Sequence, residues 1–315
     1  MKNSSRIKKK ENLLKKNSII FLILFSISIF AEPISQIQYE KLAFGTNETL
    51  EIMTWNIQNF PKSEYTVDYA TGIILAIDAD VIGLQEIESD SAFVVLLKNL
   101  QKQNPKDKWN GFRANTNEWE MNLAYLYKSC MINVDSIYQI YPDDEKYHYP
   151  FPRKPLMLEF SCFDQKFFII NNHLKAMPGE KNMMRRKDAC RLLDEYIDEF
   201  LSEENVILLG DLNDQLTDPK EENAFTIFLE DKTNYYFADW EIAVDSTANW
   251  SYPYWKYRSH LDHILISNEL FDEFAIAGSE IKTITIDKFM EGEGDARYKY
   301  ITDHRPVVLK LMFLK

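Results

Sequence analysis

The chain has 315 residues, 45% of them hydrophobic, and its 36 Lys and Arg residues against 49 Asp and Glu residues give a net charge of −13 at pH 7. This length and apolar content suffice for one large core, and no Gly-, Ser- or Pro-rich linker divides the chain, so we expect a single folded domain after the N-terminal segment. The acidic balance excludes a protein that coats nucleic acid through a generally basic surface.

The first 31 residues have the composition of a secretory signal peptide. Seven Lys and Arg residues precede an uncharged run over residues 18–30, and Ala31 follows this run. The run is short for a membrane span, which needs about 20 residues. Ile29 stands where a second small residue is preferred, so an uncleaved anchor is the alternative to cleavage. We therefore expect export to the periplasm or the extracellular space, with residues 32–47 as a lead-in.

Apolar periodicity predicts alternating strands and helices over residues 48–315. Short apolar runs are typical of buried strands, and apolar residues three or four apart are typical of helices. In chain order, we expect a strand at 49–55, a helix at 63–77, a strand at 81–84, a helix at 91–100, strands near 123–127, 132–140, 156–160 and 167–172, a helix at 183–201, a strand at 206–209, a helix from about 219 to 229, an aromatic-rich loop at 231–259, and strands at 261–266 and 306–314. This order predicts an α/β fold, a four-layer sandwich of two packed mixed β-sheets flanked by helices.

Polar side chains follow several of these strands at the point where each strand ends. The clearest case is residues 206–214, where Gly210 ends four apolar residues and Asp211 and Asn213 follow two apart. In extended backbone this spacing sends both side chains to the same side, although an ordinary polar turn has the same composition. The other strand-end groups are Asn56, Glu86, His173, Asp262, Asp303 and His304. We expect all of them to converge on one rim of the sheets, where α/β folds place their chemistry.

The residue types in this set favour metal-dependent hydrolysis. Carboxylates, amides and two imidazoles are present, whereas the GxSxG and GxxxxGK[ST] motifs are absent. Oxygen-rich ligands suit Mg²⁺, with Mn²⁺ or Ca²⁺ as alternatives, rather than zinc. Cys130, Cys162 and Cys190 are too few for a disulfide framework, and their apolar or amphipathic surroundings favour three buried free thiols over one bridge with a thiol left over.

Six short motifs occur in the order of a known superfamily. They are Thr54-Trp55-Asn56, Leu84-Gln85-Glu86, Asn172-His173-Leu174, Gly210-Asp211-Leu212-Asn213, His260-Leu261-Asp262-His263-Ile264 and Thr302-Asp303-His304-Arg305-Pro306. Over about residues 48–314 the chain resembles the endonuclease/exonuclease/phosphatase superfamily, which includes pancreatic-type deoxyribonucleases, abasic-site endonucleases, neutral sphingomyelinases and inositol-polyphosphate phosphatases. Each motif is weak alone, and the ordered set of six is specific.

The resemblance implies which residues hold the metal ion. Glu86 would ligate a divalent cation, with Asn56 beside it contacting metal or phosphate, and Asp303 would lie near the metal. A strand-end glutamate that caps the following helix is the alternative for Glu86. Some abasic-site endonucleases carry an acid two residues after the asparagine, where this chain has Gln58. A second metal ligand at that position is therefore in doubt.

The resemblance also implies catalytic roles. His304, polarised by Asp262, would be the general base or a phosphate-activating group, because a carboxylate that holds one imidazole nitrogen raises the basicity of the other. Asp211 would orient the attacking water, and Asn213 would donate to a phosphate oxygen. His173 would stabilise or protonate the leaving side. The alternative for Asp262 is a strand carboxylate paired with neighbouring His260 or His263, and the alternative for His173 is a satisfied strand-end histidine.

Three further residues are weaker candidates for phosphate or substrate binding. Glu120 matches a site carboxylate of the deoxyribonuclease branch only loosely, and a solvated strand residue fits equally well. Arg185 and Arg186 open the long helix after His173 and either clamp phosphate or form an exposed basic helix face.

The function expected from all these features is a secreted nuclease. Its partner would be nucleic acid as substrate, with no stable protein partner and a monomeric state. A sphingomyelinase or other small phosphodiesterase is the main alternative, and aromatic residues near Trp250 would then enter a membrane lipid surface rather than stack on bases or pack within the loop. A non-catalytic binding module of the same fold is the third reading, and the complete polar set speaks against it because buried carboxylates without a ligand are costly.

Overall fold

The computed structural model describes residues 35–315 except 116–120, 246, 254–257 and 314–315. The predicted signal peptide, residues 32–34 of the lead-in and Glu120 therefore lie outside the described residues. No helix in the described part of the chain is long and apolar enough to cross a membrane.

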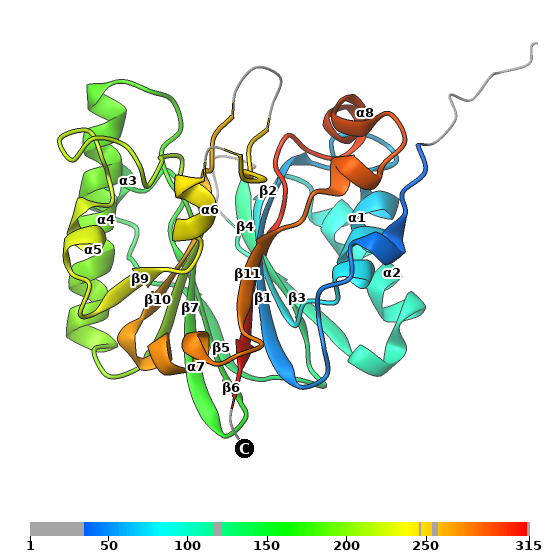
Figure 1. The fold of residues 1–315 in the computed structure, drawn as a ribbon, viewed down its shortest axis with the longest axis horizontal. Helices are drawn as coiled ribbons and strands as arrows, with labels where there is room; N and C mark the ends of the chain where they lie inside the picture. The colour runs from blue at the N-terminus through cyan, green and yellow to red at the C-terminus, as the bar shows by residue number, and fades with distance from the viewer. Residues whose placement is uncertain (1–34, 116–120, 246, 254–257, 314–315) are drawn as a thin grey trace, which may run out of the picture. The chain divides into compact units, whose positions relative to one another are not determined.

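Two six-stranded mixed sheets form the centre of the described fold (Figure 1). The first has the order β11 (Glu280–Thr283), β12 (Val307–Met312), β1 (Thr49–Phe60), β2 (Val81–Ile87), β4 (Asn122–Lys128) and β3 (Trp109–Arg113). The second has the order β5 (Asn133–Gln139), β6 (Leu156–Cys162), β7 (Gln165–His173), β8 (Asn205–Asp211), β10 (Asp262–Ser267) and β9 (Tyr235–Phe237). Strands β1 and β2 are parallel, as are β7 and β8, and the other described pairs are antiparallel.

Helices cover the outer face of each sheet, which confirms the predicted α/β sandwich. Helices α1 (Thr66–Ile77), α2 (Asp90–Gln103) and α8 (Glu293–Tyr300) share a core with β1 and β2 of the first sheet. Helices α4 (Glu180–Phe200) and α5 (Thr226–Glu230) share another core with β7 and β8 of the second sheet. A third core lies between the sheets. Shorter helices are α3 (Glu145–His148), α6 (Trp240–Val244) and α7 (Phe271–Ala275), and 3₁₀ turns span Tyr39–Lys41, Pro105–Asp107, Asn268–Leu270 and Ile286–Phe289.

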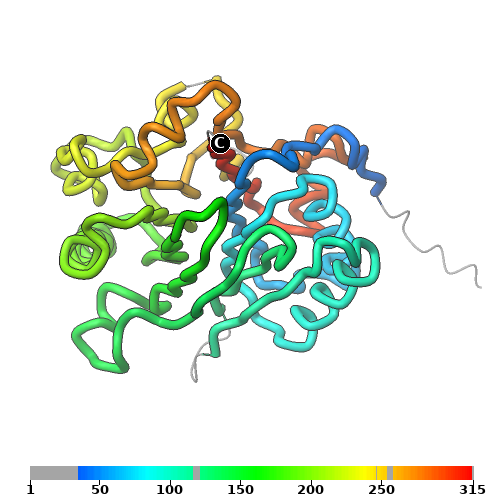
Figure 2. The backbone as a smooth tube through the Cα atoms, turned by 90° about the horizontal axis from the view of Figure 1, so that it is seen from below, coloured from blue at the N-terminus to red at the C-terminus, as the bar shows by residue number. Residues whose placement is uncertain are grey.

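Two groups of polar contacts cross the core between the sheets. The amide of Gln85 on β2 donates to the side-chain oxygen of Asn171 on β7 at 2.8 Å, and Asn171 donates in turn to the backbone of both β2 and β4. The hydroxyl of Tyr125 on β4 lies 2.9 Å from the carbonyl oxygens of Leu156 and Ile169. A buried polar group must be paired to be tolerated, so these contacts fix the register of one sheet against the other. Figure 2 shows the result from below, with the C-terminal strand running beside the N-terminal strand.

Several local predictions were wrong. The helix expected from about 219 to 229 begins only at Thr226, because the Asn223 amide donates to the carbonyls of Gln215, Leu216 and Asp218 and folds the preceding segment into turns. The expected loop at 231–259 contains β9 and α6. Strands β3 and β11 and helix α8 had no predicted counterpart. All three cysteines are free, but Cys130 is exposed rather than buried, since it lies in the turn after β4.

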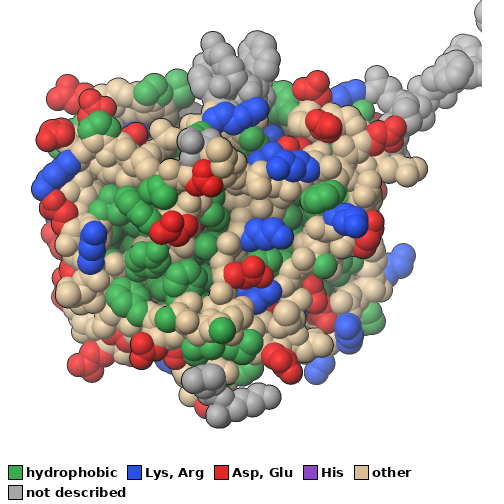
Figure 3. Space-filling model, viewed as in Figure 1, with side chains coloured by type: hydrophobic (Ala, Val, Ile, Leu, Met, Phe, Trp, Pro, Cys, Tyr) green, Lys and Arg blue, Asp and Glu red, His purple; other side chains and the backbone are tan. Residues whose placement is uncertain are grey.

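Charged side chains of both signs are interspersed on the face of the molecule seen in Figure 3. Hydrophobic side chains gather on that face where Figure 1 shows β9 and β10. This face therefore presents no continuous basic surface, as the acidic composition predicts.

Candidate active site

Seven of the predicted polar side chains meet at one end of the two sheets. They come from β1, β2, β7, β8, β10 and the segment before β12, and are Asn56, Glu86, His173, Asp211, Asp262, Asp303 and His304. We call this set the rim cluster. Both sheets contribute to it, so the cluster exists only when the sheets are packed together.

Asn56 connects the two sheets within the rim cluster. Its amide nitrogen donates to Glu86 Oε1 at 3.1 Å and to Asp211 Oδ2 at 2.9 Å. Asn56 is almost completely buried, and its own side-chain oxygen accepts from the backbone N–H of Gln58 at 2.9 Å. One neutral amide therefore holds two carboxylates close together, an arrangement that favours a cation between them.

His304 and Asp262 form a buried pair. Nδ1 of His304 lies 2.7 Å from Oδ2 of Asp262, and Nε2 faces Asp211 at 3.7 Å and Asp303 at 3.9 Å. Burial alone would lower the pKa of His304, but the charges of Asp262 and Asp211 outweigh it and raise this pKa to about 10. Without a cation in the rim cluster, His304 is therefore an imidazolium at neutral pH.

The pKa of Asp211 is raised by its surroundings in the rim cluster. Burial raises the pKa of Asp211 to about 7, with the charges of Asp262 and Glu86 adding to it and His304 opposing it. A bound divalent cation would relieve this repulsion, and carboxylate and amide oxygens are the ligands that Mg²⁺, Mn²⁺ and Ca²⁺ prefer. Asp211, Asp262 and His304 place one ligand atom each within 4.8 Å of one another. The rim cluster thus fits a divalent metal ion.

His173 is held in its neutral form. Burial lowers its pKa well below the ordinary value, and the cations of Arg153 and His304 lower it further. Its Nε2 lies 3.5 Å from Asp211 Oδ2 and 3.9 Å from Glu86 Oε1, while its Nδ1 is buried without a hydrogen-bond partner in the described residues. One nitrogen of this neutral imidazole is therefore left without a partner among the described residues, while the other faces the carboxylates of the rim cluster.

The backbone at the rim is in a conformation that side-chain-bearing residues rarely adopt. Glu86 has φ 61° and Asn213 has φ 54°, and both residues follow the buried part of a strand. Such positions cost about 1–3 kcal/mol each and occur at functional sites, where the surrounding structure enforces them. The left-handed conformation of Glu86 directs its side chain toward Asn56, and that of Asn213 turns the chain after Asp211.

Asn213, the eighth strand-end residue, and the two weaker candidates among the described residues, Arg185 and Arg186, have different surroundings. The backbone N–H of Asn213 donates to Asp211 Oδ1 at 3.1 Å, and its amide donates to the carbonyl of Leu174 at 3.3 Å. Arg186 is buried and donates to Asp214 at 2.9 Å, so the structure does not bring it to the rim cluster. Arg185 donates to the carbonyl of Tyr149 at 2.6 Å.

Sequence reasoning missed several charged or polar neighbours of the rim cluster. Gln58 donates to Asp303 Oδ2 at 2.8 Å and accepts from Lys62, so the position in doubt as a metal ligand supports Asp303 instead. Arg153, from the loop before β6, interacts electrostatically with Glu86 and Asp211, although burial lowers its pKa. The only available signal was the Pro-rich segment 142–155, which does not reveal where its cations lie.

A second buried cluster contains Asp239, His260 and His263. Asp239 Oδ2 lies 3.0 Å from Nε2 of His260 and 2.6 Å from Nδ1 of His263. The other ring nitrogen of each histidine is also used, by the N–H of Ser251 and by the carbonyl of Asp214. The second carboxylate oxygen, Asp239 Oδ1, accepts from the N–H of Ile264 at 2.8 Å, so every candidate ligand atom of this cluster already has a partner and we interpret the cluster as structural. It also shows that His260 and His263 pair with Asp239 and leave Asp262 to His304.

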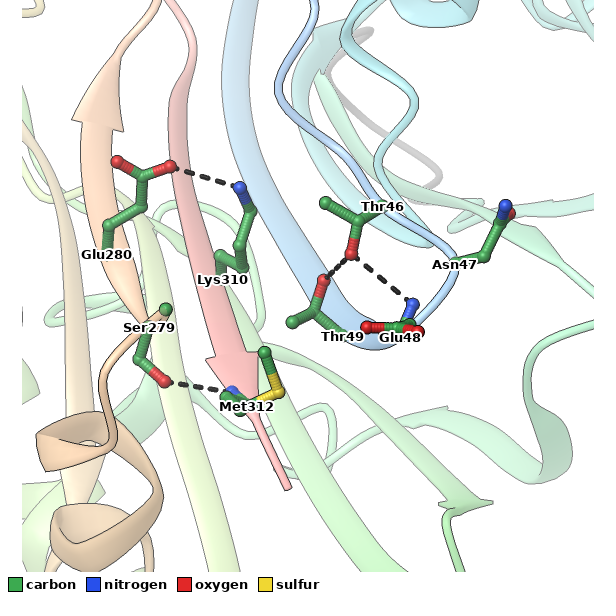
Figure 4. A pocket seen from close by; sticks show the side chains of 9 residues that line it. Thr46, Asn47, Glu48, Thr49, Ser279, Glu280, Lys310 and Met312 are labelled. Atoms are coloured by element: carbon green, nitrogen blue, oxygen red, sulfur yellow. Dashed lines mark hydrogen bonds and ion pairs between the residues drawn. The ribbon is translucent and has the colours of Figure 1, made fainter. Parts of the chain in front are cut away.

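A surface pocket lies at the other ends of β1 and β12 from the rim cluster (Figure 4). Thr49 at the start of β1 and Met312 at the end of β12 line it, and Glu280 pairs across it with Lys310 at 3.0 Å. The imidazoles and strained turns of the rim cluster are absent from its lining, so we do not assign the chemistry to this pocket.

Comparisons with known proteins agree with this geometry. The profile of the Endonuclease/Exonuclease/phosphatase family matches residues 53–304. No curated protein matches the chain.

Solved structures with a similar fold have low sequence identity to the chain. D. rerio TDP2 complexed with single strand DNA product has a TM-score of 0.60 and 13% identity, over 84% of this chain and 99% of that one. The human Nocturnin catalytic domain with bound sulfate anion has a TM-score of 0.57 and 17% identity, over 85% of this chain and 94% of that one. A protein of the same family from Leptotrichia buccalis has a TM-score of 0.59 and 16% identity, over 84% of this chain and 100% of that one. At these identities the likeness concerns the fold.

Proposed function

Because the chain belongs to the Endonuclease/Exonuclease/phosphatase family and has its hydrolase fold, we propose that it is an exported, divalent-metal-dependent phosphodiesterase that cleaves nucleic acid. The observation that carries this proposal is the rim cluster, in which Asn56 holds Glu86 and Asp211 together opposite the Asp262–His304 pair. The family match supports the phosphodiesterase class, and to it we add a nucleic-acid substrate, a divalent metal ion and export.

Glu86, Asn56 and Asp303 are the proposed residues around the metal ion, with Mg²⁺ as the expected cation. A divalent cation bound there supplies positive charge to the phosphoryl oxygens and the leaving oxygen of the substrate. Burial, followed by the charges of Asp262 and Glu86, raises the pKa of Asp211, and this supports the placement because a divalent cation nearby would stabilise the ionised carboxylate.

Four side chains have the remaining roles in an in-line attack by water on the phosphodiester. Asp211 accepts a hydrogen bond from the attacking water and orients it, and Asn213 donates to a non-bridging phosphate oxygen. His304, fixed through its Nδ1 by Asp262, presents Nε2 to the phosphate. The preorganised donors stabilise the charge that develops in the transition state. We assign to His173, which burial keeps neutral, the exchange of a proton with the leaving oxygen.

The nucleic-acid part of the proposal has support from one similar structure. TDP2 from D. rerio was crystallised with a single strand DNA product. A chain with 29 positive and 48 negative charges after residue 31 repels polyanions at long range, so a nucleic-acid substrate must be held by local groups.

The test is hydrolysis of four substrates by the purified exported form of the chain. We expect phosphodiester cleavage of single-stranded DNA, plasmid DNA or RNA in the presence of Mg²⁺, and loss of cleavage with a chelator. His304→Ala should lower kcat at least about 100-fold, the usual scale for a positioned acid–base or electrostatic group. Sphingomyelin vesicles are the fourth substrate.

His148→Ala is the matched control, because His148 is exposed on α3 and pairs with Asp143 outside the rim cluster. It should leave cleavage unchanged. Turnover of sphingomyelin without cleavage of nucleic acid would replace the nuclease proposal by the lipid phosphodiesterase alternative. Cleavage that persists at full rate in the chelator or in His304→Ala would contradict the proposed site.

A further inference from the structure

Three cations beside the rim cluster have no carboxylate partner among the described residues. Lys175 donates to the carbonyl of Ala176 at 3.0 Å, and Arg185 donates only through Nε, to the carbonyl of Tyr149. Arg153 donates through Nη2 to the sulfur of Met121 at 3.1 Å, and a thioether is a weak acceptor. Most of the donors on these two guanidinium groups and on the ammonium group are thus available to a ligand.

The loops that carry these cations are fixed to the first turns of α4. The Arg185 guanidinium lies over the Tyr149 ring, 5.0 Å from its centroid, in addition to the hydrogen bond to Tyr149. The next residue, Arg186, binds the carbonyl oxygens of Lys175 and Met177 at 2.9 and 3.2 Å. Arg186 is itself neutralised by Asp214. The segment after β7 and the loop before β6 therefore present their cations from fixed backbone.

The three cations also repel one another. Burial lowers the pKa of Lys175, and the charges of Arg185 and Arg153 lower it further. Burial likewise lowers the pKa of Arg153, which is attracted by Glu86 and Asp211 and repelled by Arg185. Like charges gathered in an otherwise acidic chain cost free energy unless an anion is bound. Arg153 and Lys175 interact with residues of the rim cluster, and Arg185 interacts with both of them, so this anion would lie beside the reacting phosphate.

We propose that Arg153, Lys175 and Arg185 form a cationic site that binds a second phosphate group of the substrate, adjacent to the phosphate that is hydrolysed. The proposal rests on the phosphodiesterase function proposed above and specifies its substrate class. The substrate is an oligonucleotide-like polyanion with at least two phosphate groups.

The chemistry of the site distinguishes between the candidate substrates. A guanidinium group matches the geometry of a phosphate through two parallel N–H donors, and a lysine adds a point charge. A sphingomyelin headgroup has one phosphate, which would occupy the rim cluster, and a quaternary ammonium group that three neighbouring cations would repel. The site therefore favours nucleic acid over a choline lipid.

The test compares substrates that differ only in flanking phosphates. The dinucleotides TpT and UpU have one phosphate, and pTpTp and pUpUp present the same scissile bond with additional phosphates. For Arg185→Gln we expect KM for the phosphate-rich substrate to rise about tenfold with kcat within about twofold, and unchanged kinetics on the one-phosphate substrate. The matched control is Arg191→Gln, because Arg191 is exposed on the same helix and pairs with Glu195. A similar change on both substrates, or no change, would overturn the proposal.

A binding measurement separates this proposal from the proposed function. Fluorescein-labelled (dT)₈ is titrated with His304→Ala protein, with and without Arg185→Gln, at several salt concentrations. We expect Arg185→Gln to weaken binding about tenfold and to reduce the slope of log Kd against log salt by about 0.7, the value for one lost contact to a single strand. If no nucleic acid is hydrolysed but this difference is found, the proposed function fails and the cationic site stands. Equal binding in both proteins would remove the cationic site even if hydrolysis is observed.

Discussion

The Asp262 carboxylate sets the charge state of His304. In the cation-free protein it contributes most to holding the pKa of His304 at about 10, above its ordinary value of 6.5. Because the folded protein binds this proton more tightly than the unfolded chain, the pair stabilises the fold most below pH 6.5, and this contribution is lost as the pH rises toward 10. Asp262 also fixes the ring so that Nε2 faces the rim cluster.

At the residue scale, we predict that Asp262→Asn lowers kcat by about 100- to 10,000-fold, the range found when an imidazole loses its acidic partner. The pKa of His304 should fall toward its ordinary value, which NMR titration of the ring measures directly. Asp135→Asn, an equivalent change at an exposed position of β5, is the control and should alter neither quantity. An unchanged pKa of His304 in Asp262→Asn would contradict the assigned pairing.

The strand-end residues could be located from the sequence because each follows an apolar run, and the fold then brings those runs to one rim. Asp239 and Arg153 could not be located in this way. Asp239 pairs with two histidines more than twenty residues away, inside a segment whose aromatic content suggested a loop. Arg153 is one of several cations near prolines, and only the packing of its loop against α4 brings it to the acids. Long-range pairing of this kind leaves no local pattern.

Strand β8 ends at a position where only glycine fits. Gly210 has φ +143°, and a Cβ atom built there would lie 1.9 Å from the carbonyl oxygen of Asn172 on β7. The clash is with backbone, so no side-chain rotation can relieve it. Asp211 follows directly and would move with any displacement of the two strands.

At the element scale, we predict that Gly210→Ala lowers the free energy of unfolding by about 3 kcal/mol or more, since it combines a backbone clash with a conformation that alanine rarely adopts. Urea unfolding measures this change. Gly294→Ala is the control, because a Cβ at this position of α8 meets nothing within 4 Å, and alanine favours a helix by up to about 1 kcal/mol over glycine. Similar stability of the two variants would show that β7 and β8 can separate without loss.

The sandwich class was predicted correctly because the long apolar runs have clear periodicity. The shorter elements were missed for physical reasons. Strands β3 and β9 lie at sheet edges, with only part of their side chains buried, and β11 has four residues, so their patterns are weak. The start of α5 was misplaced because a single side chain, Asn223, satisfies loop carbonyls that a helix would otherwise use.

At the scale of the whole molecule, stability should fall at alkaline pH through Glu51. This residue is fully buried on β1, and burial together with the neighbouring Asp80 raises its pKa to about 8, although the Thr49 hydroxyl opposes the shift. Because the pKa is higher in the folded state than in the unfolded chain, the contribution of Glu51 is greatest below about pH 4.5 and is lost as the pH rises through 8.

We therefore predict that Glu51→Gln, which stays uncharged, loses less stability than the unsubstituted protein between pH 5 and pH 9. Urea unfolding at a series of pH values measures this difference. Glu48→Gln, an exposed position three residues earlier, provides the control and should follow the unsubstituted protein. A Glu51→Gln curve parallel to that of the unsubstituted protein would mean that Glu51 titrates normally.

The pairing of β1 with β12 has a consequence for the order in which activity arises during translation. Residues 49–60 leave the ribosome long before residues 307–312, with which β1 pairs. A nascent chain that has not reached His304 already carries Asn56 and Glu86 but lacks the imidazole that completes their site. The rim cluster is therefore complete only after the C-terminal segment that contains Asp303 and His304 has been synthesised and has paired with the strands made first.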